Sequence, residues 1–266
     1  MYKMSPSVRW SRWVVVLLWG LGFHQARAQA QEARTQAQAQ AAPPSRPKPG
    51  VEFRTVLSKI LKDNSAFVQA HPKEFFGRFR DEQHPQVTVV ACSDSRFHTN
   101  SIDRIPDDDL YMVRNIGNQI DSALGSVQYG VHHLRTPVLL IIGHVGCGAV
   151  KTAMSDYSNI EPGIRRELDG LHLAVRRTAA KGTFQEQWLT NVIGNVHQQV
   201  KYGMLEYAED VRAGRLVILG AVYDFRDDLK QGAGRLVVIN LNGETDPNKL
   251  ATQIGIPDCA LNQGAR

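Results

Sequence analysis

Five short apolar runs, separated by segments with helical periodicity, constrain the fold of this chain most. Each run is rich in Val, Ile and Leu, and the run at 137–142 is typical of a strand buried on both faces. Strands that alternate with helices form a mainly parallel sheet. We therefore predict an α/β fold with helices on both faces of a mainly parallel sheet. Its strands are expected at 87–91, 110–113, 137–142, 216–223 and 236–241, and the last of them is free to run antiparallel.

Apolar residues at three- and four-residue spacing predict the helices. The first helix carries Phe53, Val56, Leu57, Ile60 and Leu61, so one of its faces needs a surface to cover it. Further helices are expected at 75–79, 122–134, 163–181, 185–200 and 202–213.

The first 50 residues lack the patterns of the folded part. Residues 1–28 combine a basic start, an apolar core of eleven residues and a small-residue pattern that ends at Ala28 or Ala30, which indicates a secretory signal. The alternative is a membrane anchor, but a span needs about 20 apolar residues. We expect an exported, periplasmic or secreted protein without a stable membrane anchor, cleaved near Ala28 or Ala30. Residues 29–50, rich in Gln, Ala and Pro, predict a disordered spacer, which leaves 51–266 as a single folded domain.

The formal net charge of +5 comes largely from the predicted signal. That segment holds four basic residues and no acidic one, and the 31 basic residues less these four leave 27 against 26 acidic residues. The remaining charge of +1 does not indicate a nucleic-acid surface. The three cysteines are too few for a disulfide framework.

Two of the predicted strands lead into residues that bind soft metals. Cys92 follows the run at 87–91, His144 follows the run at 137–142, and Cys147 comes three residues later. The carboxyl ends of neighbouring parallel strands meet at one edge of a sheet, so these side chains can converge. Two thiolates and an imidazole suit tetrahedral Zn²⁺, and three protein ligands leave a fourth position open, as in a catalytic site.

Asp94 and Arg96 stand beside the first cysteine, where they could act on whatever fills the open position. They could also form a local salt bridge. A disulfide between Cys92 and Cys147 is a further alternative, which would leave His144 and both charged residues without a role. The glycine-rich turn after His144 lacks the spacing of a phosphate-binding loop.

Together these motifs resemble those of the β-class carbonic anhydrases. The sequence Cys-Ser-Asp-Ser-Arg at 92–96 resembles the first zinc motif of the family, and His-Val-Gly-Cys at 144–147 resembles the second. The segments Val-Arg-Asn-Ile-Gly-Asn at 113–118 and Gly-Ala-Val-Tyr-Asp at 220–224 are also similar, and the resemblance extends from about residue 51 to 250. It implies an enzyme, a carbonic anhydrase, that reversibly hydrates carbon dioxide to bicarbonate and a proton. Its cofactor would be Zn²⁺, held by Cys92, His144 and Cys147.

The resemblance also implies roles for further residues. Asp94 would orient the nucleophile and Arg96 would hold Asp94 ionised, while Asp94 would become a metal ligand only if the site closes. Gln83 would donate a hydrogen bond to the substrate. His98 and His84 are candidates for proton transfer, because histidine titrates in the required range.

The chain departs from the family pattern at the residues after Arg96, where Phe97, His98 and Thr99 replace the usual Val and Pro. Val89 stands where members with a regulatory bicarbonate pocket carry Trp, so we expect an open site with water as the fourth ligand. The family also implies N-terminal helices that pack on a partner subunit, in a homodimer or a dimer of dimers. Cys259, outside every motif, is expected to be dispensable.

Two other functions remain open from the sequence. One is hydrolysis of a related small molecule, carbonyl sulfide or carbon disulfide, by the same metal site. The other is a non-catalytic zinc-binding protein on the same fold, for which Asp94 and Arg96 would be unnecessary.

Overall fold

The computed structural model describes residues 52–175 and 182–255. The predicted signal, the predicted spacer and Cys259 lie outside these ranges, and the single-domain boundary at 51–266 stays a prediction. None of the helices in the described ranges combines the length and the apolar content that a membrane crossing needs.

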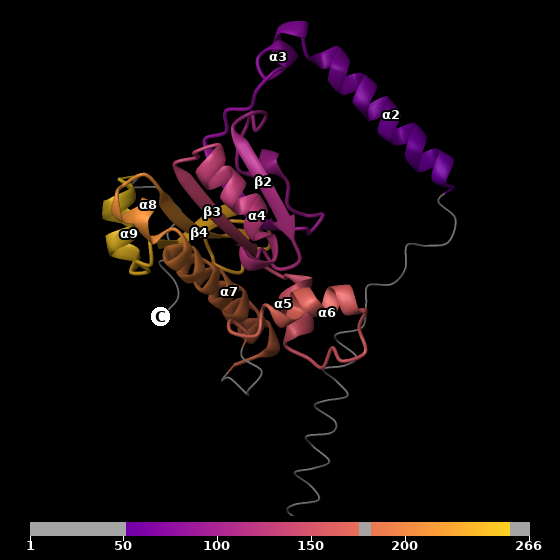
Figure 1. Ribbon diagram of the computed structural model, residues 1–266. Coiled ribbons are helices and arrows are strands. Elements are labelled where there is room, and N and C mark those ends of the chain that lie inside the picture. The colour runs from indigo at the N-terminus through magenta and orange to yellow at the C-terminus, as the bar shows by residue number, and fades with distance from the viewer. Residues whose placement is uncertain (1–51, 176–181, 256–266) are drawn as a thin grey trace, which may run out of the picture. The chain divides into compact units, whose positions relative to one another are not determined.

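A sheet forms the centre of the fold (Figure 1). It has five strands in the order β2-β1-β3-β4-β5. The first four strands pair in parallel, and β5 runs antiparallel to β4. The predicted mainly parallel α/β sheet with flanking helices is therefore confirmed. The strands are β1 (Val87–Cys92), β2 (Leu110–Asn115), β3 (Val138–His144), β4 (Val217–Asp224) and β5 (Arg235–Leu241).

The described helices precede, connect and follow these strands. They are α2 (Phe53–Ala70), α3 (Lys73–Gly77), α4 (Leu124–Gln128), α5 (Gly148–Ala153), α6 (Pro162–Asp169), α7 (Phe184–Glu206), α8 (Ala208–Arg212) and α9 (Pro247–Ile254). Three short helical turns complete the described chain, η1 (Thr99–Ser101), η2 (Asp121–Ala123) and η3 (Tyr129–His133).

Three helix predictions were wrong in their bounds. The helix expected at 163–181 ends at Asp169, and residues 170–174 follow as turns that bury Leu171 in the core. The helices expected at 185–200 and 202–213 are instead a 23-residue α7 and a short α8. A capping box fixes the start of α7, because the Thr183 hydroxyl accepts from the Glu186 N–H and the Glu186 carboxylate accepts from the Thr183 N–H.

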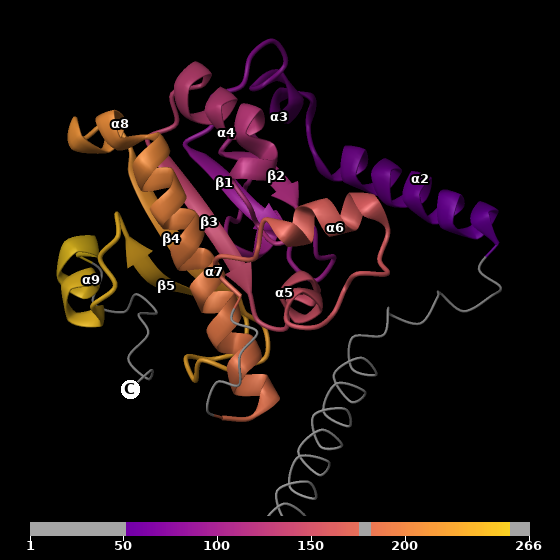
Figure 2. The same ribbon diagram turned by 60° about the horizontal axis from the view of Figure 1, so that its bottom comes forward.

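The two faces of the sheet bury alternate residues of each strand. On one face Val90, Leu139 and Ile141 pack with residues of α4 and α7 in the larger core. Figure 2 shows these two helices beside the sheet. On the opposite face Val89, Ala91 and Ile142 form a smaller cluster around Phe97, which follows β1. The chain segment after β1 is thus anchored to the second face.

Close packing of α7 fixes the end of the sheet where the metal site was predicted. A β-carbon at Gly143 would lie 2.6 Å from a methyl group of Val196, so only glycine lets this helix approach β3 so closely. His144 follows at once and ends β3, beside the end of β1 at Cys92. Parallel pairing of β1 with β3 therefore brings both side chains to the same edge.

Every residue of α2 is exposed to solvent in the described part of the chain. Its apolar residues include Phe53, Leu57 and Ile60, with 69%, 50% and 58% of their surface exposed. The face that the sequence pattern predicted is therefore present and uncovered. Its predicted contact with a partner subunit stays a prediction.

Candidate metal centre

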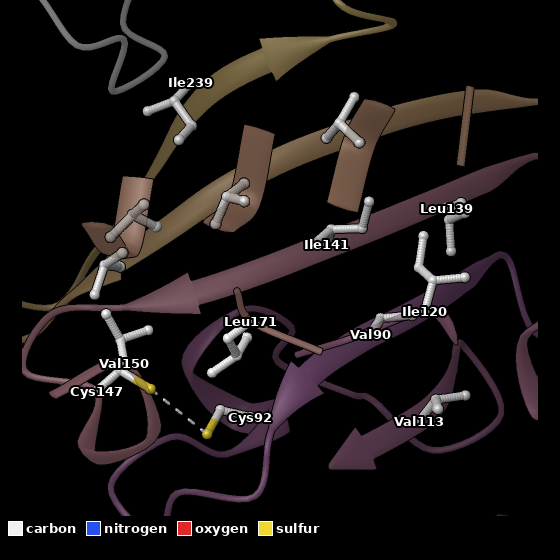
Figure 3. Packing of buried hydrophobic residues seen from close by; sticks show 14 of the residues in the cluster. Val90, Cys92, Val113, Ile120, Leu139, Ile141, Cys147, Val150, Leu171 and Ile239 are labelled. Atoms are coloured by element: carbon white, nitrogen blue, oxygen red, sulfur yellow. Dashed lines mark hydrogen bonds between the residues drawn. The ribbon is translucent and has the colours of Figure 1, made fainter. Parts of the chain in front are cut away.

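Cys92, His144 and Cys147 converge at the carboxyl edge of the sheet. Their ligand atoms all lie within 4.8 Å of one another. Cys92 and His144 end β1 and β3, and Cys147 is the residue before α5, so three separate elements supply them. The two sulfur atoms face each other 4.0 Å apart (Figure 3).

This group meets the requirements of a tetrahedral metal site. Zinc–sulfur bonds of about 2.3 Å at tetrahedral angles place two sulfurs about 3.8 Å apart, close to the separation between Cys92 and Cys147. His144 is 2% exposed, and its Nε2 has no hydrogen-bond partner in the described residues. Its Nδ1 lies 3.0 Å from the Val145 carbonyl oxygen, and donation to that oxygen leaves the Nε2 lone pair available to a metal. The residues present therefore fit a metal ion.

The two thiols are electrostatically unequal without a cation. The hydrogen bond from Cys147 lowers the pKa of Cys92 to about 4. The pKa of Cys147 is raised well above its ordinary value, first because it gives that hydrogen bond to Cys92 and then because it is fully buried. One buried thiolate thus forms readily and the second does not, which is the imbalance that a divalent cation would remove.

Asp94 and Arg96 form a bidentate ion pair at the rim of this group. Arg96 Nε and Nη2 donate to the two carboxylate oxygens over 2.8 and 2.7 Å, and Nη2 also donates to the Gly146 carbonyl oxygen. The Arg96 hydrogen bond lowers the pKa of Asp94 to about 2. The Asp94 carboxylate lies 3.7 Å from His144 Nε2, so a charged acceptor stands beside the ligand group.

Known proteins of similar sequence identify the family. A family profile described as carbonic anhydrase matches residues 87–230, which is more than half of the chain. This chain belongs to the carbonic anhydrase family. A carbonic anhydrase of Mycolicibacterium smegmatis is 30% identical over 182 residues, which cover 64% of this chain and 88% of that protein. The predictions of a carbonic anhydrase and of an enzyme are confirmed.

Solved structures agree on the fold. A β-carbonic anhydrase of Coccomyxa, solved in complex with acetazolamide, has a TM-score of 0.61 at 21% identity and covers 74% of this chain and 91% of its own. A structure of tetrameric β-carbonic anhydrases of Sordaria macrospora has a TM-score of 0.60 at 23% identity and covers 71% and 98%. The β-class fold is therefore confirmed. Because β-carbonic anhydrases are zinc enzymes and the Cys2His group fits this metal, the predicted Zn²⁺ cofactor is confirmed as well.

Gln83, the predicted substrate ligand, lies far from this metal group within one chain. It precedes β1, and the step from Val87 to Cys92 spans about 17 Å at 3.3 Å per residue. Gln83 lines a hollow of about 500 Å³ together with Tyr129 and His133. The structure of one carbonic anhydrase chain thus places the metal ligands and Gln83 at opposite edges of its sheet.

Three residues around the metal group were given no role from the sequence. The ring of Phe225, just after β4, lies 4.8 Å below the Arg96 guanidinium and 6.2 Å from the His144 ring. Trp188 Nε1 on α7 donates to the Cys147 carbonyl oxygen over 2.8 Å. Arg114 hydrogen-bonds the carbonyl oxygen of Cys92. Only Arg114 had a sequence signal, because it stands in the family-like segment 113–118; Phe225 and Trp188 had none.

The two proton-transfer candidates differ in their surroundings. His98 is exposed and directly follows Phe97 in the loop after β1. His84 lies before β1, and its ring nitrogens are within 3.6 Å of Glu82 and Asp108 carboxylates. His98 is therefore the nearer of the two to the ligand group along the chain.

Proposed function

We propose that this chain catalyses the reversible hydration of carbon dioxide to bicarbonate and a proton, at a zinc ion held by Cys92, His144 and Cys147. The observation that carries the proposal is the meeting of this buried ligand group with the charged Asp94–Arg96 pair at one edge of the sheet. A protein that only binds zinc needs the ligand group but not the Asp94–Arg96 pair. The pair beside it supplies what a reaction needs, a fixed acceptor next to the open position.

Zinc, when bound, supplies a Lewis acid that lowers the pKa of a water molecule toward neutrality. The protein's own contribution is orientation. The Asp94 carboxylate accepts a hydrogen bond from the nucleophile and fixes its direction, and it stays charged because Arg96 lowers its pKa to about 2. Arg96 is held in turn by the Gly146 carbonyl oxygen and by the Phe225 ring. We propose that Asp94 remains paired with Arg96, which keeps the fourth metal position open.

Gln83 belongs to the site through a second copy of the chain. Its distance from Cys92 within one chain excludes direct cooperation there, whereas the exposed apolar face of α2 offers a surface for association. The tetrameric β-carbonic anhydrases of Sordaria macrospora, which share this fold, support such assembly here. We propose a homodimer or a dimer of dimers in which Gln83 of one subunit donates a hydrogen bond to the substrate of the other.

Export completes the proposal. The basic start, short apolar core and small-residue pattern of residues 1–28 support cleavage near Ala28 or Ala30 and a periplasmic or secreted enzyme. Sequencing the N-terminus of the protein recovered from the periplasm of an expression host tests this part. An uncleaved chain, or a chain retained in the cytoplasm, contradicts it.

Stopped-flow carbon dioxide hydration by the zinc-loaded chain from Gln29 onward tests the function. We expect hydration well above the buffer rate, and Asp94→Asn should lose most of it while keeping its zinc. A wild-type protein with one zinc per chain but no hydration activity overturns the proposal in favour of a binding role. Parallel assays with carbonyl sulfide and carbon disulfide distinguish a related hydrolase, which would turn over one of these substrates faster than carbon dioxide.

A further inference from the structure

Arg114 lies in the family-like segment 113–118, and the function proposed above assigns it no task. It stands on β2 opposite Ala91 of β1, one residue before the end of both strands. Its guanidinium donates four hydrogen bonds to backbone carbonyl oxygens of the segment that follows. Nε and Nη2 donate to Cys92 over 3.1 and 2.9 Å, and Nη2 donates to Asp94 and Phe97 over 3.0 and 2.7 Å.

These bonds come from two of the three guanidinium nitrogens, Nε and Nη2. The guanidinium is a rigid planar fork whose donors point in several fixed directions, unlike the single ammonium of lysine. In the described ranges no carboxylate pairs with Arg114, so its bonding is directed at this one loop. The guanidinium also lies 5.5 Å from the centre of the Phe97 ring, which is 1% exposed. Arg114 and buried Phe97 therefore fix both ends of the segment 92–97.

The loop held in this way carries the reacting groups. Cys92, at its start, supplies a sulfur to the metal group, and Asp94, in its middle, supplies the carboxylate. The Asp94 residue is held at two points, by Arg114 at its carbonyl oxygen and by Arg96 at its carboxylate. A shift of the Asp94 backbone would change the 3.7 Å separation between its carboxylate and His144 Nε2.

We propose that Arg114 is a positioning residue for the reaction: by binding the carbonyl oxygens of Cys92, Asp94 and Phe97, it sets the place of the Asp94 carboxylate and of the Cys92 sulfur. This inference rests on the proposed function for its effect on rate. Its effect on metal binding does not depend on that function. Residues that support metal ligands from behind typically contribute 10- to 100-fold to metal affinity or to activity.

A simple structural brace is the alternative to a positioning role. A brace would lower the stability of the whole fold and leave the activity of the folded, zinc-loaded protein unchanged. A positioning residue acts through Asp94, so its loss should matter little once the Asp94 carboxylate has been removed. Coupling between the two sites in a double-mutant cycle separates these cases.

The experiment compares Arg114→Lys, Arg114→Met and Asp94→Asn with the two double variants. Arg215→Met is the matched control, because Arg215 also donates two hydrogen bonds through its guanidinium, but at the opposite edge of the sheet. Three quantities are measured on each protein: zinc affinity by competition with a chromophoric chelator, kcat/KM of the zinc-saturated enzyme, and the midpoint of urea unfolding.

We expect Arg114→Met to lower zinc affinity and kcat/KM by about tenfold or more each, with Arg114→Lys between this variant and the wild type. In the Asp94→Asn background the same changes should lower kcat/KM by less than about twofold, because the carboxylate they position is gone. Arg215→Met should leave zinc affinity and kcat/KM unchanged.

Several results overturn the inference. Wild-type zinc affinity and kcat/KM in either Arg114 variant would show that the three carbonyl contacts position nothing. Losses of kcat/KM that are the same with and without the Asp94 carboxylate would show that Arg114 has only a structural role. If Arg114→Met does not fold, Arg114→Lys decides by the same two measurements. A zinc-loaded wild type without hydration activity refutes the proposed function instead, and leaves the zinc-affinity test of Arg114 intact.

Discussion

Titratable side chains lie at both the carboxyl and the amino edge of the sheet. The two groups differ in whether their polar atoms have hydrogen-bond partners. At the carboxyl edge Cys92, His144 and Cys147 are buried, and the His144 Nε2 has no hydrogen-bond partner in the described ranges. At the amino edge His132, Asp210 and Arg215 satisfy one another, with Asp210 accepting from both of its neighbours. The side chain of His132 is 52% exposed there, against 2% for His144.

This difference indicates which edge needs a ligand. Buried polar atoms without partners are costly, so a fold retains them where an ion or substrate completes them. Exposed groups that pair with each other need nothing further and contribute little to stability. The amino edge nevertheless holds Gln83, so one part of the proposed site remains apart from the other within a single chain. The predictions below test this contrast, from the largest expected effect to the smallest.

Cys147→Ala should abolish metal binding, because the two protein ligands that remain are too few to hold zinc at a site whose fourth position is open. Metal analysis should fall from about one zinc per chain to near zero, and hydration should fall by roughly a thousandfold or more. Cys259→Ser, outside every motif, is the control and should keep both. Undiminished zinc in Cys147→Ala would refute the ligand group.

Oxidation should inactivate the metal-free protein and spare the zinc-loaded one. The facing sulfurs of Cys92 and Cys147 are 4.0 Å apart, so a small rearrangement allows hydrogen peroxide to convert the two thiols to a disulfide, with peroxide reduced to water. Zinc occupies both sulfurs and prevents this. Oxidised apo-protein should regain activity with zinc only after a reductant is added. Full recovery with zinc alone would contradict the pairing of these thiols.

Asp94→Asn should keep zinc but lower hydration by about 100-fold, because an amide does not replace a charged acceptor. The pH dependence follows from the sign of the shift. Folding lowers the pKa of Asp94 from its ordinary value of 3.8 to about 2. The stabilisation that the ionised carboxylate contributes is therefore fully present above pH 3.8, and it is lost only as the pH falls through about 2. The ratio of wild-type to variant rates should therefore stay constant from pH 5 to 9. A ratio that falls within this range would assign a titrating role to Asp94.

Gln83→Ala should lower kcat/KM by about tenfold, the effect of losing one hydrogen bond to developing charge. Co-expression with Asp94→Asn tests whether the two edges cooperate between subunits. A mixed dimer contains one site with both Asp94 and Gln83, so random pairing restores about a quarter of the wild-type sites. Activity no higher than the average of the two parent variants would contradict a shared site.

The sequence predicted the features that leave a local pattern. Short apolar runs marked all five strands, and the Cys92, His144 and Cys147 positions followed from where two strands end. The early end of α6 could not be predicted, because Leu168 and Leu171 are both buried and continue the apolar pattern past the end of the helix at Asp169.

Contacts with backbone atoms left no comparable signal. Arg114 binds three carbonyl oxygens, and since every residue has one, no partner residue type marks the contact. The sequence also did not show that Gln83 lies far from Cys92. The nine positions from Gln83 to Cys92 include the whole of β1, so the chain runs from the amino edge of the sheet to its carboxyl edge between these two residues.

Arg215→Met at the amino edge should have the smallest effect. Its pair with Asp210 is exposed, with 63% of the Arg215 side chain in contact with solvent, and such pairs stabilise proteins by about 0.2–1 kcal/mol. Hydration should stay within about twofold of wild type, and the unfolding midpoint in urea should fall only slightly. Both are measured on the zinc-loaded protein. A loss of activity near that of Gln83→Ala would show that the ion pairs of the amino edge also serve the site, and that the contrast between satisfied and unsatisfied edges is wrong.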